Sequence, residues 1–356
     1  MTAPARWDYA TRVAAKERAM EGGFTLVRGL TSGGFGGTVT LAGADAADLV
    51  ATAEAAPCAL PAALAECGGV LLIPGMGGVA TAPELLLRLS RIFGPEVENY
   101  RETGSAPNLV HPEVPQIFVV SNTPPASRQP PAKPEPELTP EGKFPVQFPQ
   151  RRGWHSDQSF RRPPPDVSLF LGVQTVPRGQ GQTLFADATA AYEALSPEMQ
   201  ARIEGVDGLH IGGGLGRRRE AVLAGTPAPA LKPNQLPQRQ PLVREHPVTG
   251  KRALYMCEYG QMDWLEGPIY GMEPGPHGEG AKLLEALMSH CTQERFVYVH
   301  EWTPGDLVIW DNRCTLHAAT WFDAEHEARV MWRTTVSGNP GAMYEGEAKS
   351  WLAAAE

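Results

Sequence analysis

The first hundred residues alternate between strand-like and helix-like patterns of apolar positions. Residues 24–42 mix β-branched residues with glycines, which predicts short strands. Residues 44–67 are rich in alanine with interspersed Asp and Glu, which predicts an amphipathic helix. Residues 70–75 predict a buried strand, and residues 82–94 predict a helix that ends at its glycine. This part of the chain therefore predicts strands with helices packed beside them.

Beyond residue 166, short apolar runs recur between turn-forming residues. The runs are VSLFLGVQTV, TLFAD, ALYMCEY, RFVYVHEW, DLVIWDN and RVMWRTTVSG. Helical patterns occur mainly in residues 189–205 and 279–292. Many short strands with few helices indicate a sandwich or barrel-like β fold. We therefore expect a mainly β fold with flanking helices, and the length of 356 residues suits either one large domain or two ordinary domains.

One long segment fits neither pattern. Residues 121–150 contain nine prolines among polar residues, so they form neither a regular helix nor a central strand. Long structureless segments in compact domains are either flexible surface excursions or functional lids. Both alternatives stay open for this insertion, and the shorter irregular stretch 226–241 has the same ambiguity.

The composition narrows the class of partner. Hydrophobic residues make up 42% of the chain and charged residues 20%, which is enough for a sizeable core. The net charge of −9 argues against a nucleic-acid partner. Five scattered cysteines without a CxxC pair favour a reducing compartment, and no apolar stretch resembles a leader or a membrane span. We expect a cytoplasmic protein that acts on a small molecule, and association of identical chains stays open.

The strongest local signal is the sequence WHSDQSF, in which His155 and Asp157 are two residues apart. In a strand, residues i and i+2 point to the same face, so both side chains would reach one metal ion. An imidazole and a carboxylate are two of the three ligands of a facial triad, which leaves coordination positions open. An HxD triplet alone is weak, because such triplets also arise at surfaces and helix caps.

The C-terminal part of the chain adds a third ligand and two cations. His317 follows a strand-like run and is a candidate third metal ligand. Arg329 and Arg333 are four residues apart in another such run, so they share one face of a strand. Buried arginines require anions, which a dicarboxylate co-substrate and an acidic substrate would supply. The alternative is that both arginines pair with acids nearby in the sequence, namely Asp323, Glu325 and Glu327.

The order of these residues, an HxD triplet followed by a threonine, a distal histidine and an arginine, resembles the TauD/TfdA family. The segments FGGTVTLAGAD, GQGQTLFAD and PGDLVIWDNRCTLHAATWFD, and the helix that runs into RIFG, also resemble family segments. The resemblance covers about residues 24–340 apart from the proline-rich stretches. It implies that residues 1–356 form a single domain with a core at about 24–340, folded as a double-stranded β-helix of the jelly-roll or cupin type. It also implies an iron(II)- and 2-oxoglutarate-dependent dioxygenase that oxidises a small anionic substrate with oxygen and releases succinate and carbon dioxide.

The resemblance assigns roles to residues of this chain. It implies that His155, Asp157 and His317 bind the iron and are the catalytic residues. Thr183 would hydrogen-bond one carboxylate of 2-oxoglutarate, and Arg329 would form a salt bridge with it. The 1-carboxylate and the keto oxygen of 2-oxoglutarate would chelate the metal.

The resemblance also implies residues at the edge of the site. Trp310, in the WDN stretch, would pack beside the iron and the co-substrate, and Arg333 matches the position that holds the acidic group of the substrate in taurine-oxidising members. Arg151 stands just before the HxD triplet, where the family pattern differs, and Asn99 and Tyr100 lie near the family's substrate-side segment. We expect these last three residues to contact the substrate.

Two other classes of function stay open. A zinc hydrolase would use the same His155, Asp157 and His317, but it leaves Thr183 and Arg329 without a role. A non-catalytic protein that binds small acids would use the same fold and would bind 2-oxoglutarate without forming succinate. Cys314 and His317 form a CxxH string, but their odd spacing sends them to opposite faces of a strand, so we do not expect them to share a zinc ion.

Overall fold

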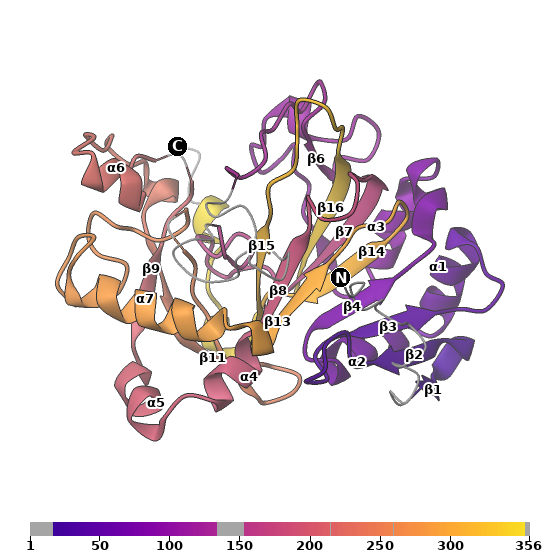
Figure 1. Ribbon diagram of the computed structural model, residues 1–356, viewed down its shortest axis with the longest axis horizontal. Coiled ribbons are helices and arrows are strands. Elements are labelled where there is room, and N and C mark those ends of the chain that lie inside the picture. The colour runs from indigo at the N-terminus through magenta and orange to yellow at the C-terminus, as the bar shows by residue number, and fades with distance from the viewer. Residues whose placement is uncertain (1–16, 134–152, 214, 259, 353–356) are drawn as a thin grey trace, which may run out of the picture.

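The protein is built on one large and one small β-sheet, as described by a computed structural model for residues 17–133, 153–213, 215–258 and 260–352 (Figure 1). The large sheet has the strand order β1 (Glu17–Ala19), β2 (Thr25–Arg28), β3 (Gly37–Thr40), β4 (Val70–Ile73), β14 (Leu307–Asp311), β7 (Val167–Gln174), β16 (Val330–Ser337) and β5 (Glu96–Val97), with β6 (Phe118–Ser121) also paired to β16. Neighbouring strands are antiparallel except for β3 and β4.

The small sheet has the order β13 (Val297–His300), β8 (Thr183–Asp187) and β15 (Thr315–Ala319). Two further strand pairs are β9 (Asp207–His210) with β10 (Gln238–Pro241), and β11 (Val243–Glu245) with β12 (Arg252–Leu254).

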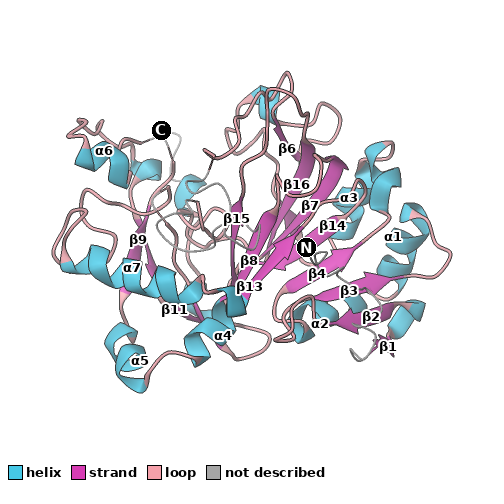
Figure 2. Cartoon of the chain, in the orientation of Figure 1, coloured by secondary structure: helices cyan, strands magenta, loops and turns pink. Residues whose placement is uncertain are grey.

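Helices cover the outer sides of the sheets (Figure 2). They are α1 (Ala46–Ala55), α2 (Ala59–Glu66), α3 (Glu84–Ser90), α4 (Ala188–Glu193), α5 (Pro197–Ile203), α6 (Arg219–Leu223) and α7 (Glu279–Cys291). Short 3-10 helices occupy Glu21–Gly23, Met76–Ala80, Pro107–Leu109, Pro233–Gln235, Glu294–Phe296, Ala342–Tyr344 and Ser350–Leu352. Helices α1 to α3 lie around the β1–β4 end of the large sheet, whereas α5 to α7 lie at the opposite end of the molecule (Figure 1).

The core is divided by the large sheet. On β14, Leu307 and Ile309 pack into the cluster formed with α1 to α3, whereas Val308 and Trp310 pack into a second cluster that includes Phe185 of the small sheet. This alternation is the two-residue period of a strand with both faces buried. The inner face of the large sheet therefore looks toward the small sheet, and the two inner faces enclose the candidate site.

Several predicted elements are confirmed and some are not. Strands β2, β3 and β4 lie within the predicted stretches 24–42 and 70–75, and α7 lies within 279–292. The single helix predicted over 44–67 was wrong, because α1 and α2 are separate and meet at an angle of 93°. The break at Ala56 precedes Pro57, and a residue before proline is disfavoured in helical conformation. The described chain is a mixed α/β structure, so the predicted predominance of strands holds only in part.

Within the described residues, no helix is by itself long and apolar enough to cross a membrane. The bent pair α1 and α2 meets the length and composition test only when the two helices are joined. The proline-rich insertion is described only as far as residue 133, so the choice between lid and excursion lies outside the described residues.

Candidate active site

The candidate site lies between the two sheets, on strand faces that point toward each other. Phe170 of β7, Trp310 of β14 and Phe185 of β8 share one buried apolar cluster. Ser168 and Thr183 stand two residues before Phe170 and Phe185 in their strands, so their side chains point into the same space. The strand pleat thus directs polar groups from both sheets into one interior region.

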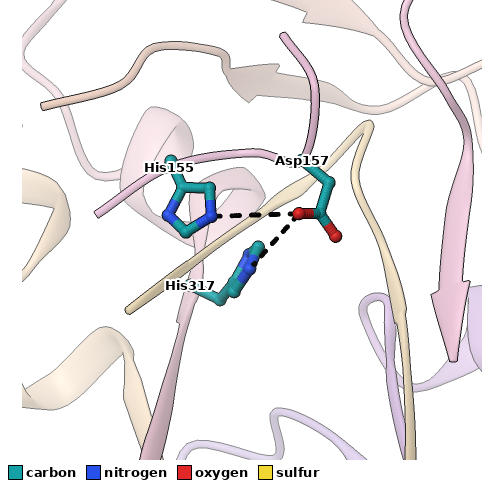
Figure 3. A group of neighbouring side chains, drawn as sticks. All are labelled: His155, Asp157 and His317. Carbon is teal, nitrogen blue, oxygen red and sulfur yellow. Dashed lines mark ion pairs between the residues drawn. The ribbon is translucent and has the colours of Figure 1, made fainter. Parts of the chain in front are cut away.

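His155 and His317 are held side by side by a backbone bridge. The amide of His155 donates to the carbonyl of His317 at 2.9 Å, and the amide of His317 donates in return at 2.8 Å. The centroids of the two rings are 4.1 Å apart. The Nδ1 atom of His155 lies 2.6 Å from the carbonyl oxygen of Gly153, which assigns the ring proton to Nδ1 and leaves a lone pair on Nε2. Both Nε2 atoms face Asp157 (Figure 3).

Asp157 completes the group. Its Oδ1 atom is 3.8 Å from Nε2 of His155 and 3.8 Å from Nε2 of His317, and the three ligand atoms lie within 4.8 Å of one another. The prediction that the HxD triplet lies in a strand was wrong, because the chain turns directly after the bridge at His155 and Gln158 has a φ of +48°. The backbone amide of Asp157 donates instead to a side-chain oxygen, Oδ1 of Asn312, at 3.1 Å. The two side chains nevertheless converge.

The protonation states of this group suit a divalent metal ion. Burial lowers the pKa of His155, and it lowers the pKa of His317 to about 3, so both rings are neutral at pH 7. Burial alone would raise the pKa of Asp157, but chiefly the positive charge of Arg333 lowers it to about 2. The site therefore offers two neutral imidazoles and one carboxylate, which is the donor set of an iron(II) facial triad.

Arg329 is a buried cation with no counter-ion among the described residues. Its Nε and Nη2 atoms have no hydrogen-bond partner, and its guanidinium lies 5.8 Å from the ring centroid of Phe170. Burial lowers its pKa to about 10, so it is still charged at neutral pH. Thr183 accepts a hydrogen bond of 3.0 Å from Nε1 of Trp302, whose ring packs 5.4 Å from that of Phe170. Arg329 and Thr183 therefore both lie beside the packed Phe170–Trp302 ring pair.

Trp310 packs against His317, one of the metal-site candidates. Its ring centroid is 4.7 Å from that of His317, and its Nε1 atom donates to Asn312 at 2.9 Å. The indole is almost completely buried. It fixes the orientation of the His317 ring by packing.

Arg333 is buried beside the metal-site candidates. Its Nη1 atom donates to Oδ1 of Asp157 at 2.5 Å, and its guanidinium lies 5.2 Å from the ring centroid of Phe118. Burial acts to lower the pKa of Arg333, but the carboxylate of Asp157 raises it above the ordinary arginine value. Neither Arg329 nor Arg333 pairs with the acids at positions 323, 325 and 327 in the described structure, so the local-pairing alternative does not explain them.

The residues predicted to contact the substrate differ in position. Tyr100 is buried next to Arg333, and its hydroxyl lies 2.7 Å from Oγ1 of Thr335. Asn99 instead uses its side chain within its own turn, where it donates to Glu102 at 2.7 Å. Arg151 lies outside the described residues.

Sequence reasoning missed three residues at this site. Arg128 stacks over Phe118 with its guanidinium 5.6 Å from the ring centroid, and no acidic partner pairs with it in the described part of the chain. Burial and the neighbouring charge of Arg333 lower its pKa. It lies in the proline-rich insertion, where no periodic pattern indicates a side-chain direction. The other two, Ser168 and Asn312, are uncharged residues inside predicted strands, where the pattern alone gives them no role.

A second group of potential ligands is an ion-pair network. His246, Asp311 and Cys314 have ligand atoms within 4.8 Å of one another. Nδ1 of His246 accepts two backbone amides at 3.2 Å, and its Nε2 lies 3.0 Å from Asp311. Arg313 binds both oxygens of Asp311, at 2.8 and 2.6 Å. Their lone pairs are therefore engaged within the protein. Cys314 belongs to this group and His317 to the other.

The comparison with known families agrees with the geometry. Residues 26–335 match the model of the family described as "Taurine catabolism dioxygenase TauD, TfdA family". The chain belongs to this family. The family predicted from the sequence motifs is thereby confirmed, and the match includes every candidate residue discussed above.

Named proteins of other organisms are similar in sequence to this chain. The (S)-phenoxypropionate/alpha-ketoglutarate-dioxygenase of Sphingobium herbicidovorans is 34% identical over 194 residues, which cover 53% of this chain and 63% of that protein. Pentalenolactone F synthase of Streptomyces arenae is 31% identical over 265 residues, which cover 72% of this chain and 80% of that protein. The first of these matches thus spans less than two thirds of the relative.

A solved structure extends the likeness over nearly the whole fold. The structure of AAD-2 in complex with Mn(II) and N-oxalylglycine is similar with a TM-score of 0.60 and 27% sequence identity. The similarity covers 91% of this chain and 97% of that chain. The similarity therefore extends over nearly the whole fold and is not confined to one part of it.

Proposed function

We propose that this chain is an iron(II)- and 2-oxoglutarate-dependent dioxygenase that oxidises a small anionic substrate. The observation that carries the proposal is the presence of both a His155–Asp157–His317 group and the buried guanidinium of Arg329, which has no counter-ion among the described residues. The products would be succinate, carbon dioxide and an oxidised substrate, in which each oxygen molecule supplies one atom to succinate and one to the substrate. The names of the relatives support this reaction class.

His155, Asp157 and His317 would hold the iron, each through one atom. When bound, iron(II) supplies electrons and open coordination positions for oxygen activation. The protein keeps the two imidazoles neutral and the carboxylate ionised, so no proton has to leave before the metal binds. The backbone bridge between His155 and His317 fixes the separation of the two rings.

Arg329 and Thr183 would hold the distal carboxylate of 2-oxoglutarate. A buried guanidinium without an anion is costly, and a carboxylate that accepts its free N–H groups removes that cost. The hydroxyl of Thr183, already oriented by Trp302, is a second donor. Trp310 would pack beside the co-substrate and keep water from the metal site. A zinc hydrolase gives Arg329 no partner, which is the observation against that alternative.

Arg333 and Arg128 support an anionic substrate. Both guanidiniums lie over the Phe118 ring, at 5.2 and 5.6 Å from its centroid, so a carboxylate or sulfonate group that approaches Asp157 from that side meets two positive charges. Tyr100 lines the same side. We infer that Arg151 serves the same side from the segment just before the HxD triplet, whereas the side-chain contacts of Asn99 lie within its own turn.

We also propose that residues 1–356 act as one domain whose two sheets form a double-stranded β-helix. The inward faces of β7, β14 and β16 on one side and of β8 and β15 on the other support this reading. A cytoplasmic location is supported by the five cysteines, all of which are free thiols.

The test measures co-substrate turnover directly. Protein reconstituted anaerobically with iron(II) is mixed with 2-oxoglutarate and oxygen, and succinate is quantified in the presence of sulfonates, aryloxyalkanoates, amino acids or purines. We expect one class of acid to stimulate succinate release together with oxygen uptake. Zinc as the bound metal without oxygen uptake would favour the hydrolase, and tight 2-oxoglutarate binding without succinate would favour the non-catalytic protein.

A further inference from the structure

The two oxygens of Asp157 have different surroundings. Oδ1 faces Nε2 of both histidines and accepts from Arg333. Oδ2 accepts a hydrogen bond of 2.7 Å from the hydroxyl of Ser168. Ser168 is completely buried in β7, between the backbones of β14 and β16, so its hydroxyl has little freedom to leave this oxygen.

Asn312 fixes the direction of that hydroxyl. Its Nδ2 atom donates to Oγ of Ser168 at 2.9 Å, which occupies a lone pair of that oxygen and leaves its proton for Asp157. Oδ1 of Asn312 accepts from the amide of Asp157 at 3.1 Å and from Nε1 of Trp310 at 2.9 Å. The Asn312 carbonyl accepts from Ser156 at 2.7 Å. One fully buried side chain therefore orients the serine and the loop that carries the carboxylate.

If a metal ion is bound as in the function proposed above, this arrangement determines how many of its coordination positions stay open. An octahedral ion with three protein ligand atoms has three positions left, two for a chelating 2-oxoglutarate and one for oxygen. A carboxylate that bound through both oxygens would occupy one of these three. We propose that Ser168, oriented by Asn312, is a positioning residue that holds Asp157 as a one-oxygen ligand and so keeps the third position open.

Ser168→Ala tests this directly, because it removes the hydroxyl and frees Oδ2. The variant binds Mn(II) at least as tightly as the parent protein, since the carboxylate gains a second metal contact. Its affinity for 2-oxoglutarate, measured by calorimetry on the Mn(II)-loaded protein, falls by about tenfold or more. Ser168→Thr keeps the hydroxyl and restores much of that affinity. A structural defect alone would weaken the binding of metal and co-substrate together.

Ser90→Ala is the matched control. Ser90 is also completely buried beneath the large sheet, but its hydroxyl contacts Leu86 and Thr334 and no metal-site candidate. We expect the control to lose comparable thermal stability and to keep the parent's 2-oxoglutarate affinity within twofold. If Ser168→Ala fails to fold, Ser168→Cys replaces it, because a thiol of similar size is a much weaker donor.

The outcomes separate this inference from the proposed function. Unchanged 2-oxoglutarate affinity in folded Ser168→Ala or Ser168→Cys protein overturns the positioning role and leaves the dioxygenase proposal intact. Equal losses in Ser168→Ala and Ser90→Ala overturn it as well, because they point to general destabilisation. A parent protein that binds no 2-oxoglutarate with Mn(II) rejects the proposed function and this inference with it.

Discussion

Nη1 of Arg333 lies 2.5 Å from Oδ1 of Asp157, so the oxygen that faces both histidines is also half of a buried ion pair. Each carboxylate oxygen has about two lone pairs, so a metal ion and an arginine can share Oδ1. The arginine thereby keeps Asp157 ionised in a place where burial alone would protonate it. The metal-site candidates and Arg333 are therefore coupled through Oδ1 of Asp157.

Arg333→Gln should therefore destabilise the metal-free protein at pH 7. Breaking a buried ion pair by removing one partner typically costs on the order of 3–5 kcal/mol, because the other charge is left unpaired. Urea unfolding of the metal-free variant measures this loss. Arg88→Gln is the control, because the ion pair of Arg88 with Glu54 is accessible to solvent. Arg313→Gln would not serve, because it breaks another buried ion pair, with Asp311. A loss no larger than that of Arg88→Gln would contradict the coupling.

His317→Ala should abolish oxygen consumption and leave the fold largely intact. The parent protein should bind about one iron(II) per chain, and the variant should lose that binding because only two ligands remain. Oxygen-electrode and metal-titration measurements check both statements. His326→Ala is the control, since His326 is an exposed residue that pairs with Asp323 outside the site. Full turnover in the His317→Ala protein would remove the metal assignment.

Arg329→Met should weaken the binding of 2-oxoglutarate without lowering the thermal stability of the protein. The substitution removes an unpaired buried charge, so the protein without 2-oxoglutarate should keep or gain thermal stability. The Michaelis constant for 2-oxoglutarate should rise steeply, by an amount corresponding to about 2–5 kcal/mol. The parent should be stabilised by added 2-oxoglutarate and the variant should not. A Michaelis constant within twofold of the parent's would assign the arginine to another role.

The candidate residues of the site could be selected from the sequence, whereas the local backbone conformation around them could not. The selection of His155, Asp157, His317, Arg329, Thr183 and Trp310 follows from the resemblance to the family's sequence pattern. The conformation of the HxD triplet could not be predicted, because it is held by hydrogen bonds that Ser156 and Asp157 donate to Asn312, more than 150 residues away.

Two further features depend on tertiary contacts that no local pattern records. Arg128 lies in a segment without periodicity, and only its stacking on Phe118 brings it to the site. Ser168 reads as one polar residue in an apolar strand, and its role appears only when Asp157 is placed opposite. The helix break at Ala56, in contrast, could have been predicted from Pro57.

Acidification should destabilise the metal-free protein already at pH values well above the pKa of its buried histidines. The pKa of His317 and that of His210 are each lowered to about 3 by burial, whereas the unfolded chain titrates near 6.5. The unfolded state therefore binds more protons below about pH 6.5, and stability falls as the pH falls. Two such histidines should cost a few kcal/mol in total between roughly pH 6.5 and 5.

Urea unfolding at several pH values measures this slope. Asp157 contributes at lower pH values. Its lowered pKa gives stability that is present above its unfolded pKa and is lost as the pH falls toward about 2. His210→Asn should reduce the slope between pH 6.5 and 5, and exposed His326→Ala should not. An identical slope in the parent and the His210→Asn protein would show that His210 is not buried as a neutral ring.

Arg128→Gln should weaken the binding of an acidic substrate and leave 2-oxoglutarate binding unchanged. Arg333 is already paired with Asp157, whereas no acid in the described structure pairs with Arg128. An incoming carboxylate or sulfonate therefore meets Arg128, on the Phe118 side of the site, as a cation that no described acidic residue already neutralises. The charge-assisted bond that is lost corresponds to a rise in the substrate Michaelis constant of about tenfold.

The measurement uses the acid that most strongly stimulates succinate release, with substrate varied at saturating 2-oxoglutarate. Arg333→Gln should raise the same constant and also lower metal affinity, which distinguishes the two arginines. Arg202→Gln serves as the control, because Arg202 is an exposed residue whose ion-pair partner, Glu279, belongs to α7. A preferred substrate without an acidic group, or an Arg128→Gln enzyme with the parent's constant, would reject anion recognition by Arg128. The iron ligands and Arg329 would keep their proposed roles in either case, because those roles rest on the His155–Asp157–His317 group and on the buried guanidinium of Arg329.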